Sequence, residues 1–120
     1  MSTRQELTHE RSLMFSGWIR KKLPDSSTGL VVSDLDFILC NYKARILMLV
    51  EIKTRNAKLR KWQRILFDNL DRWIKKGIDK DWLYYGYHVI TFENTWFNDG
   101  ICSFDGKQIS EAELVSKLSL

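Results

Sequence analysis

Two short acidic motifs in the sequence have the residue types and the spacing of a metal site. Asp34 and Asp36 alternate with apolar residues, and Glu51-Ile52-Lys53 ends a second apolar segment. If the two segments pair as an antiparallel hairpin, Asp36 and Glu51 come within roughly 5 Å of each other. Two carboxylates that close repel unless one is protonated or a cation bridges them. Mg²⁺ or Mn²⁺ would fit there, because such ions prefer oxygen ligands, and the Ile52 carbonyl can add a third.

A divalent ion between Asp36 and Glu51 would favour one kind of reaction. It can activate water and neutralise the charge that develops on a phosphate during in-line attack. Lys53 shares a strand face with Glu51, because side chains two residues apart in a strand project the same way. It can then position the water or the phosphate. We therefore expect phosphodiester hydrolysis. The structural alternative is an ion pair of Glu51 with Lys53 at an exposed strand end, with Asp36 as a turn or cap acid.

The elements that must position these residues follow from hydrophobic periodicity, turn residues and capping signals. Strands are expected at Leu30–Cys40, Ile46–Lys53, Tyr84–Phe92 and Ile101–Phe104. Helices are expected from about Arg4 to Lys22, from about Ala57 to Lys76, and from Ser110, which has capping-box spacing to Glu113. This order predicts an α/β (α+β) fold with a central mixed sheet flanked by helices.

An apolar stripe on the second helix and the aromatic residues around the third strand are expected to pack in the hydrophobic core. The second helix carries an apolar stripe that should face the sheet, and Gly77 should follow its end as a cap. The stripe consists of Trp62, Ile65, Leu66, Leu70, Trp73 and Ile74. A set of aromatic residues lies in and around the third strand. We expect these side chains to pack in the core rather than to stack on the bases of a single-stranded nucleic acid. They are Trp82, Tyr84, Tyr85, Tyr87, Trp96 and Phe97.

Positive charge gathers directly after the Glu51-Ile52-Lys53 motif. Between Lys53 and Lys80 ten Lys or Arg residues face three Asp residues, whereas the whole chain has a net charge of +4. Basic segments attract phosphate backbones without reading sequence. The expected phosphate contacts are Arg55, Lys58, Lys61 and Arg64. The alternative is a solvated helix face that contacts nothing in particular.

The segment Ser33–Arg55, SDLDFILCNYKARILMLVEIKTR, resembles the PD-(D/E)XK nuclease superfamily. Glu51-Ile52-Lys53 matches the family's (D/E)-x-K motif. The preceding Asp34-Leu35-Asp36 matches its first acidic motif, although the usual proline is absent. The likeness spans roughly Leu7 to Phe92 and implies a restriction-endonuclease-like αβββαβ core. By this match Asp36 is the main metal ligand and Asp34 an auxiliary one.

The resemblance also implies two supporting residues outside the hairpin. Many members of the superfamily have a glutamate on the first helix that reaches the metal, and Glu10 matches that place. Gln63 matches a glutamine on the helix after the lysine. Gln63 and Phe67 are similar to the Gln-x-x-x-Tyr motif of the RecB-like exonuclease branch, with Phe where Tyr is usual. The family would make the chain a Mg²⁺-dependent deoxyribonuclease.

The bulk properties agree with a single globular domain over residues 1–120. Hydrophobic residues are 44% and charged residues 28% of the 120 residues, which are ordinary values for a folded protein. We expect a core over about residues 4–92 and an appended hairpin and helix over residues 93–120. No signal peptide or membrane span is expected, so we predict a cytoplasmic protein. Its predicted partner is DNA, with a homodimer possible. The alternative function is an inactive nucleic-acid-binding or assembly module.

Overall fold

The computed structural model describes residues 13–120 of the chain. The chain forms two compact units, Met1–Val32 and Ser33–Leu120. The first unit contains α1 (Leu13–Lys22) and the 3-10 turn η1 (Ser26–Thr28). Helix α1 coincides with the second half of the first predicted helix, whose predicted start near Arg4 lies outside the described residues. The assignment of one domain to the whole chain stays a prediction.

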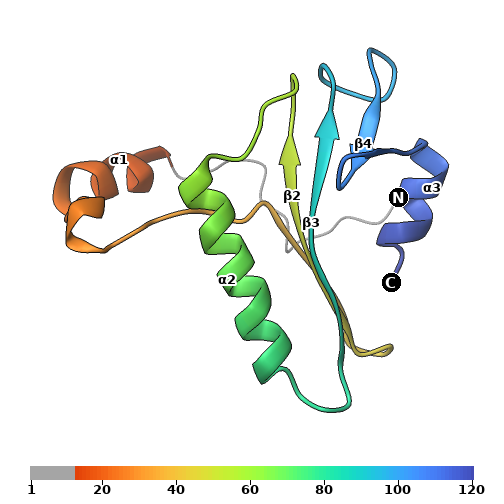
Figure 1. Ribbon diagram of the computed structural model, residues 1–120, viewed down its shortest axis with the longest axis horizontal. Helices are drawn as coiled ribbons and strands as arrows, with labels where there is room; N and C mark the ends of the chain where they lie inside the picture. The colour runs from red at the N-terminus through yellow and green to blue at the C-terminus, as the bar shows by residue number, and fades with distance from the viewer. Residues whose placement is uncertain (1–12) are drawn as a thin grey trace. The chain divides into compact units, whose positions relative to one another are not determined.

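Residues 33–120 form a five-stranded mixed sheet with helices packed against it (Figure 1). The strands are β1 (Phe37–Asn41), β2 (Ile46–Lys53), β3 (Leu83–Phe92), β4 (Cys102–Phe104) and β5 (Lys107–Gln108), in the spatial order β1-β2-β3-β4-β5. The helices are α2 (Lys61–Gly77) and α3 (Glu111–Leu118). Only the β2–β3 pair is parallel, because α2 carries the chain back between them. The predicted mixed α/β fold is confirmed at this level.

The finer fold assignment stays a prediction. Within residues 13–120 two strands, β1 and β2, precede α2, whereas the expected αβββαβ core has three strands at that place. Strand β1 is also shorter than expected, because pairing with β2 begins at Phe37 opposite Val50. No helix in the described part of the chain is both long enough and apolar enough to cross a membrane.

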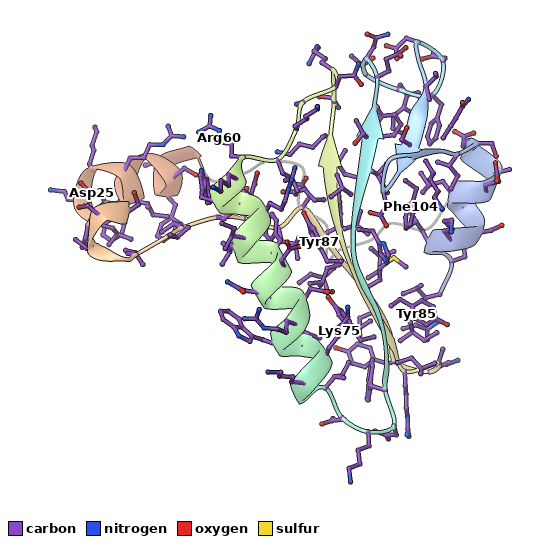
Figure 2. The ribbon with its side chains drawn as sticks, viewed as in Figure 1. Asp25, Arg60, Lys75, Tyr85, Tyr87 and Phe104 are labelled. Carbon is purple, nitrogen blue, oxygen red and sulfur yellow. The ribbon has the colours of Figure 1, made fainter. Side chains whose placement is uncertain are left out.

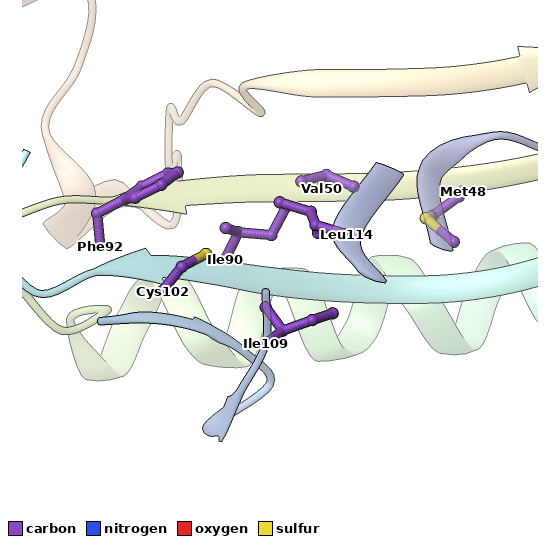
Figure 3. Close-up of a cluster of buried hydrophobic side chains, with 7 residues drawn as sticks. All are labelled: Met48, Val50, Ile90, Phe92, Cys102, Ile109 and Leu114. Carbon is purple, nitrogen blue, oxygen red and sulfur yellow. The ribbon is translucent and has the colours of Figure 1, made fainter. Parts of the chain in front are cut away.

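One face of the sheet carries the hydrophobic core cluster (Figure 3). Its buried members are Met48, Val50, Ile90, Phe92, Cys102, Ile109 and Leu114. Strands β2 and β3 supply alternate residues to this face, as the period of a strand requires. Leu114 comes from α3, which begins with the predicted capping box of Ser110 and Glu113. Residues 93–120 are therefore integral to the sheet and to its core.

Helix α2 covers the opposite face of β2 and β3. Its one fully buried residue is Phe67, 3% exposed, whose ring centroid lies 5.0 Å from that of Tyr87 on β3. The predicted apolar stripe is wrong in part, because Trp62, Ile65 and Trp73 are 42%, 52% and 55% exposed. The predicted cap at Gly77 is also wrong. Gly77 is the last helical residue, and Ile78 follows it in an extended conformation.

The orientation of α2 has a physical reason in the polar groups beneath it. Gln63, Phe67 and Asp71 recur every four residues and so share one helix face. Gln63 donates a hydrogen bond to Glu51 at 3.3 Å, and Asp71 accepts one from the Tyr87 amide at 3.0 Å. That amide follows a bulge at Gly86, which has φ +96°. Because buried polar groups need partners, this face turns towards the sheet and the tryptophans turn outward.

A pair of truncations on α2 tests which face packs against the sheet. Phe67→Ala should lower the free energy of unfolding by about 3–5 kcal/mol, because it leaves a cavity in a packed layer. Ile65→Ala on the exposed face should change it by about 0.5 kcal/mol or less. Urea unfolding followed by circular dichroism measures both. A larger loss for Ile65→Ala than for Phe67→Ala would show that the helix is rotated from this position.

Candidate active site

The hairpin of β1 and β2 brings Asp36 and Glu51 together. Asp36 directly precedes β1 and continues its pairing, so that it lies across from Glu51. The Asp36 amide donates a hydrogen bond to Oε1 of Glu51 at 3.2 Å, and the Ile52 amide donates one to Oδ2 of Asp36 at 2.9 Å. Each carboxylate thus binds the backbone beside the other. The sequence predicts that these two acids approach each other only if the hairpin register permits it. The observed register does bring them together.

Glu51 is a buried acid in a central strand. It is 3% exposed and is the one buried charged residue in the part of the chain that the structure describes. Burial raises the pKa of its carboxyl group to about 8, and a hydrogen bond and charge repulsion from the Asp36 carboxylate add to the rise. The Asp36 amide and the charge of Lys53 act in the opposite direction. Without a bound cation, burial and the neighbouring Asp36 carboxylate therefore favour the protonated form of Glu51.

Gln63 fixes the other side of the Glu51 carboxyl group. It lies in the first turn of α2, which begins after Arg60, and its amide nitrogen donates to Oε2 of Glu51 at 3.3 Å. Both oxygens of Glu51 therefore have a donor, one from Asp36 just before β1 and one from α2. A carboxylate oxygen has two lone pairs, so each can still bind a cation. Gln63 thus orients Glu51 without closing it to a metal ion.

Lys53 projects from the same face of β2 as Glu51, as predicted. It lines a cleft of about 770 Å³ bounded by the loop after β2, the start of α2, and strands β3 and β4. Two of the four predicted phosphate contacts, Lys58 and Arg64, line this cleft with it. Arg55 and Lys61 are exposed and do not line it. Three cations and two acids, Asp68 and Asp105, therefore line the cleft, whereas Asp36, Glu51 and Gln63 do not line it.

The donor set fits a divalent cation only with help from water. Asp36, Glu51 and the Ile52 carbonyl are the candidate ligands, and between residues 13 and 120 no group of three or more His, Cys, Asp or Glu residues forms a metal site. Mg²⁺ keeps several waters and commonly binds through one or two carboxylates, so this set suffices for it. Asp34 is exposed and precedes β1. Glu10, the other predicted ligand, lies outside the described residues.

The cleft contains functional candidates that the sequence pattern did not single out. Tyr87 lines it, together with Asp68, Thr91 and Asp105. Tyr87 and Thr91 face α2 because β3 pairs in parallel with β2, so that Leu49 lies opposite Tyr87 and Lys53 opposite Thr91. The signal in the sequence is the alternation of Tyr87, Val89 and Thr91. It has meaning only once the strand order is known.

No protein-family model, no curated protein and no solved structure matches the chain. The resemblance to the PD-(D/E)XK superfamily therefore rests on the motif residues themselves. What the structure adds is their geometry, with Asp36, Glu51 and Gln63 joined by hydrogen bonds and Lys53 in the adjoining cleft.

The pKa of Glu51 gives stability a definite pH dependence. With a folded pKa of about 8 against an ordinary value of 4.5, the folded state holds a proton that the unfolded state loses between these pH values. The free energy of unfolding should therefore fall as pH rises through this window, by up to about 1.4 kcal/mol per pH unit. Glu51→Gln should lack this part of the slope. Urea unfolding in EDTA at several pH values between 5 and 8 measures the difference.

The matched control for this measurement is Glu111→Gln, because Glu111 is an exposed acid at the start of α3. It should retain the wild-type slope. Identical slopes in wild type and Glu51→Gln would mean that Glu51 is ionised in the folded protein, contrary to its burial.

Proposed function

We propose that the chain is a metal-dependent nuclease that hydrolyses phosphodiester bonds of DNA at the Asp36–Glu51–Lys53 site. The observation that carries the proposal is the buried Glu51 carboxyl group beside the half-buried Asp36, with Lys53 on the same strand face as Glu51 and in the lining of a cleft. A buried carboxyl group that a neighbouring carboxylate repels is costly for the fold. A divalent cation removes that repulsion, which is a reason for such a pair to persist at a functional site.

In the proposed reaction a water oxygen forms a bond to phosphorus, one phosphorus–oxygen ester bond breaks, and the departing sugar oxygen takes up a proton. A bound Mg²⁺ or Mn²⁺ supplies charge neutralisation and water activation. Asp36, Glu51 and the Ile52 carbonyl hold the ion. Gln63 keeps Glu51 in its orientation, and Lys53 positions the attacking water or stabilises charge on the phosphate. Lys58 and Arg64 contribute electrostatic attraction for the backbone.

The second candidate is a nucleic-acid-binding or assembly module with the same cleft and no turnover. Two observations favour it. The Glu51 carboxyl group has protein hydrogen-bond partners at both oxygens without a metal ion, and Asp36 and Glu51 are the only two carboxyl groups that the described residues bring together there. Such a module would keep salt-dependent binding and would lose nothing when Glu51 is replaced. A homodimer, which the small size of the chain favours, is a further prediction for either candidate.

Substitutions at the site separate the two candidates. Glu51→Gln and Lys53→Ala should each reduce Mg²⁺-dependent DNA cleavage by about a hundredfold or more, because each removes a group that acts in the transition state. Gln63→Ala should cost about 10- to 100-fold, as expected for a residue that orients a ligand. Initial rates on single-stranded, double-stranded and branched DNA at saturating Mg²⁺ measure these effects.

Matched controls for the cleavage assay are Glu111→Gln and Lys107→Ala, which change exposed residues outside the cleft. Both should keep wild-type rates. Cleavage that survives Glu51→Gln and Lys53→Ala would show that the activity comes from a contaminant. Binding without any wild-type cleavage would favour the module.

The cleft should also determine the salt dependence of DNA binding. Lys58→Ala or Arg64→Ala should each flatten the slope of log affinity against log salt concentration by about 0.9, the value for one lost phosphate contact. Arg72→Ala on the same helix, outside the cleft, should leave the slope unchanged. Fluorescence anisotropy in EDTA across a salt series measures all three. Equal slopes for all variants would place the DNA elsewhere on the protein.

A further inference from the structure

Trp96 is an exposed aromatic residue in the loop between β3 and β4. It is 55% exposed, so the expectation that it packs in the core is wrong. Its ring stacks on that of Phe92, with centroids 5.4 Å apart and planes at 18°. The Phe97 ring meets both edge-to-face, at 5.0 Å from Phe92 and 4.9 Å from Trp96. Because Phe92 belongs to the buried core cluster, the indole is anchored on one face and open to solvent on the other.

Hydrogen bonds within the β3–β4 loop hold Trp96 in this position. The Asp99 carboxylate accepts hydrogen bonds from the Trp96 amide at 2.9 Å and from the Thr95 amide at 3.0 Å. It also accepts one from the Thr95 hydroxyl, and the Asn94 side chain donates to the Asp99 carbonyl. A ring that is held in place before binding loses little conformational freedom when a ligand stacks on it. The loop therefore presents a flat apolar surface in a fixed position.

The β3–β4 loop is hydrogen-bonded to the loop that follows β2, part of which lines the cleft. The Arg55 amide donates to the Asn94 carbonyl at 2.7 Å, and the Asn56 amide donates to the Phe92 carbonyl at 3.4 Å. Both loops lie at one end of the sheet (Figure 1). The loop after β2 ends at Arg60, which directly precedes α2 (Figure 2). The exposed indole and the cleft are therefore neighbours at this end of the sheet.

The charges of the two loops favour a nucleic acid as the ligand of Trp96. The loop after β2 contains three exposed cations, Arg55, Lys58 and Arg60, and no acid. The β3–β4 loop contains two exposed acids, Glu93 and Asp99, of which Asp99 is engaged by the hydrogen bonds of the loop. Proteins that bind single-stranded nucleic acid combine cations for the phosphates with aromatic rings for the bases. The two loops together provide both.

The cleft and the indole lie on opposite faces of the sheet. Lys53 lines the cleft on the face that α2 covers, whereas the Phe92 ring under Trp96 belongs to the core cluster on the other face. A nucleic acid that reaches both must bend around the end of the sheet. Duplex DNA has a persistence length of about 150 base pairs, and its bases are stacked within the helix. A single strand can bend there and offer an unpaired base.

We propose that Trp96 stacks on an unpaired base of a single-stranded DNA whose backbone is bound by the cations of the loop after β2. The same strand then continues into the cleft that Lys53 lines. This inference rests on the proposed nuclease function and deepens it, because it names the substrate class, single-stranded rather than double-stranded DNA.

Three substitutions test the stacking contact by fluorescence anisotropy in EDTA with a labelled oligothymidylate. Trp96→Ala should weaken binding by about 5- to 150-fold, the range for one lost base–aromatic stack. Trp96→Phe keeps an aromatic ring and should stay within about fivefold of wild type. Trp73→Ala is the matched control and should bind as wild type does. Trp73 is also 55% exposed but lies on α2, outside the cleft.

Changes in the DNA separate stacking from charge and from folding. An abasic oligonucleotide of equal length has the phosphates without the bases, so Trp96→Ala should bind it as tightly as wild type does. Duplex DNA should likewise show no difference between the two proteins. The salt dependence of oligothymidylate binding should be the same for both, because no phosphate contact is lost. An equal loss of affinity on abasic strands or on duplex would overturn the proposal.

Cleavage rates distinguish this inference from the nuclease proposal. If wild type does not cleave DNA but Trp96→Ala loses affinity only for single strands with bases, the nuclease proposal fails and the stacking contact stands. If wild type cleaves and Trp96→Ala binds oligothymidylate as tightly as wild type does, the inference is wrong and the nuclease proposal stands. A dimer that Trp96→Ala dissociates in sedimentation velocity, with DNA affinity unchanged, would overturn the inference and assign the loop to a second copy of the chain.

Discussion

The burial of the Glu51 carboxyl group on a central strand is the constraint on which the rest of this unit depends. An acid at this position must be protonated, paired or bound to a cation, since isolated buried charge is too costly to persist. The chain meets this requirement from three directions. The Asp36 amide comes from the start of β1, the Gln63 amide nitrogen from the first turn of α2, and the Lys53 charge from β2 itself. The hairpin and the helix are therefore held to β2 by polar contacts as well as by packing.

The burial of Glu51 also explains why α2 leaves two tryptophans exposed to solvent. Helix α2 turns Gln63, Phe67 and Asp71 to the sheet, and it leaves Trp62 and Trp73 largely exposed. An orientation chosen by apolar burial alone would reverse this arrangement. An unsatisfied buried polar group costs about as much as an exposed aromatic side chain gains by burial. The contacts to Glu51 and to the Tyr87 amide, together with the burial of Phe67, therefore offset the exposure of the two tryptophans.

The sequence predicts those features of the site that depend on local periodicity. It does not predict those that depend on contacts between segments distant in the sequence. The sequence predicts Glu51 and Lys53 on one face, because a two-residue period is a local property of a strand. The short turn between two apolar segments predicts a hairpin, but the approach of Asp36 to Glu51 depends on a register that the turn alone does not determine. The rotation of α2 was not predictable, because its hydrophobic stripe is a local signal and the polar groups it must satisfy belong to other strands. Tyr87 was missed as a site residue for the same reason, since the β2–β3 pairing that brings it to the cleft joins segments distant in the sequence.

The central claim is that Asp36 and Glu51 hold a divalent metal ion, and a crystal soaked in Mn²⁺ tests it most directly. Anomalous scattering should place one Mn²⁺ in contact with a carboxylate oxygen of Asp36, one of Glu51 and the Ile52 carbonyl, with water completing the shell. The Asp36 and Glu51 carboxylates should both be ionised in that crystal. Mn²⁺ bound only elsewhere, with none in contact with Asp36 or Glu51, would contradict the account.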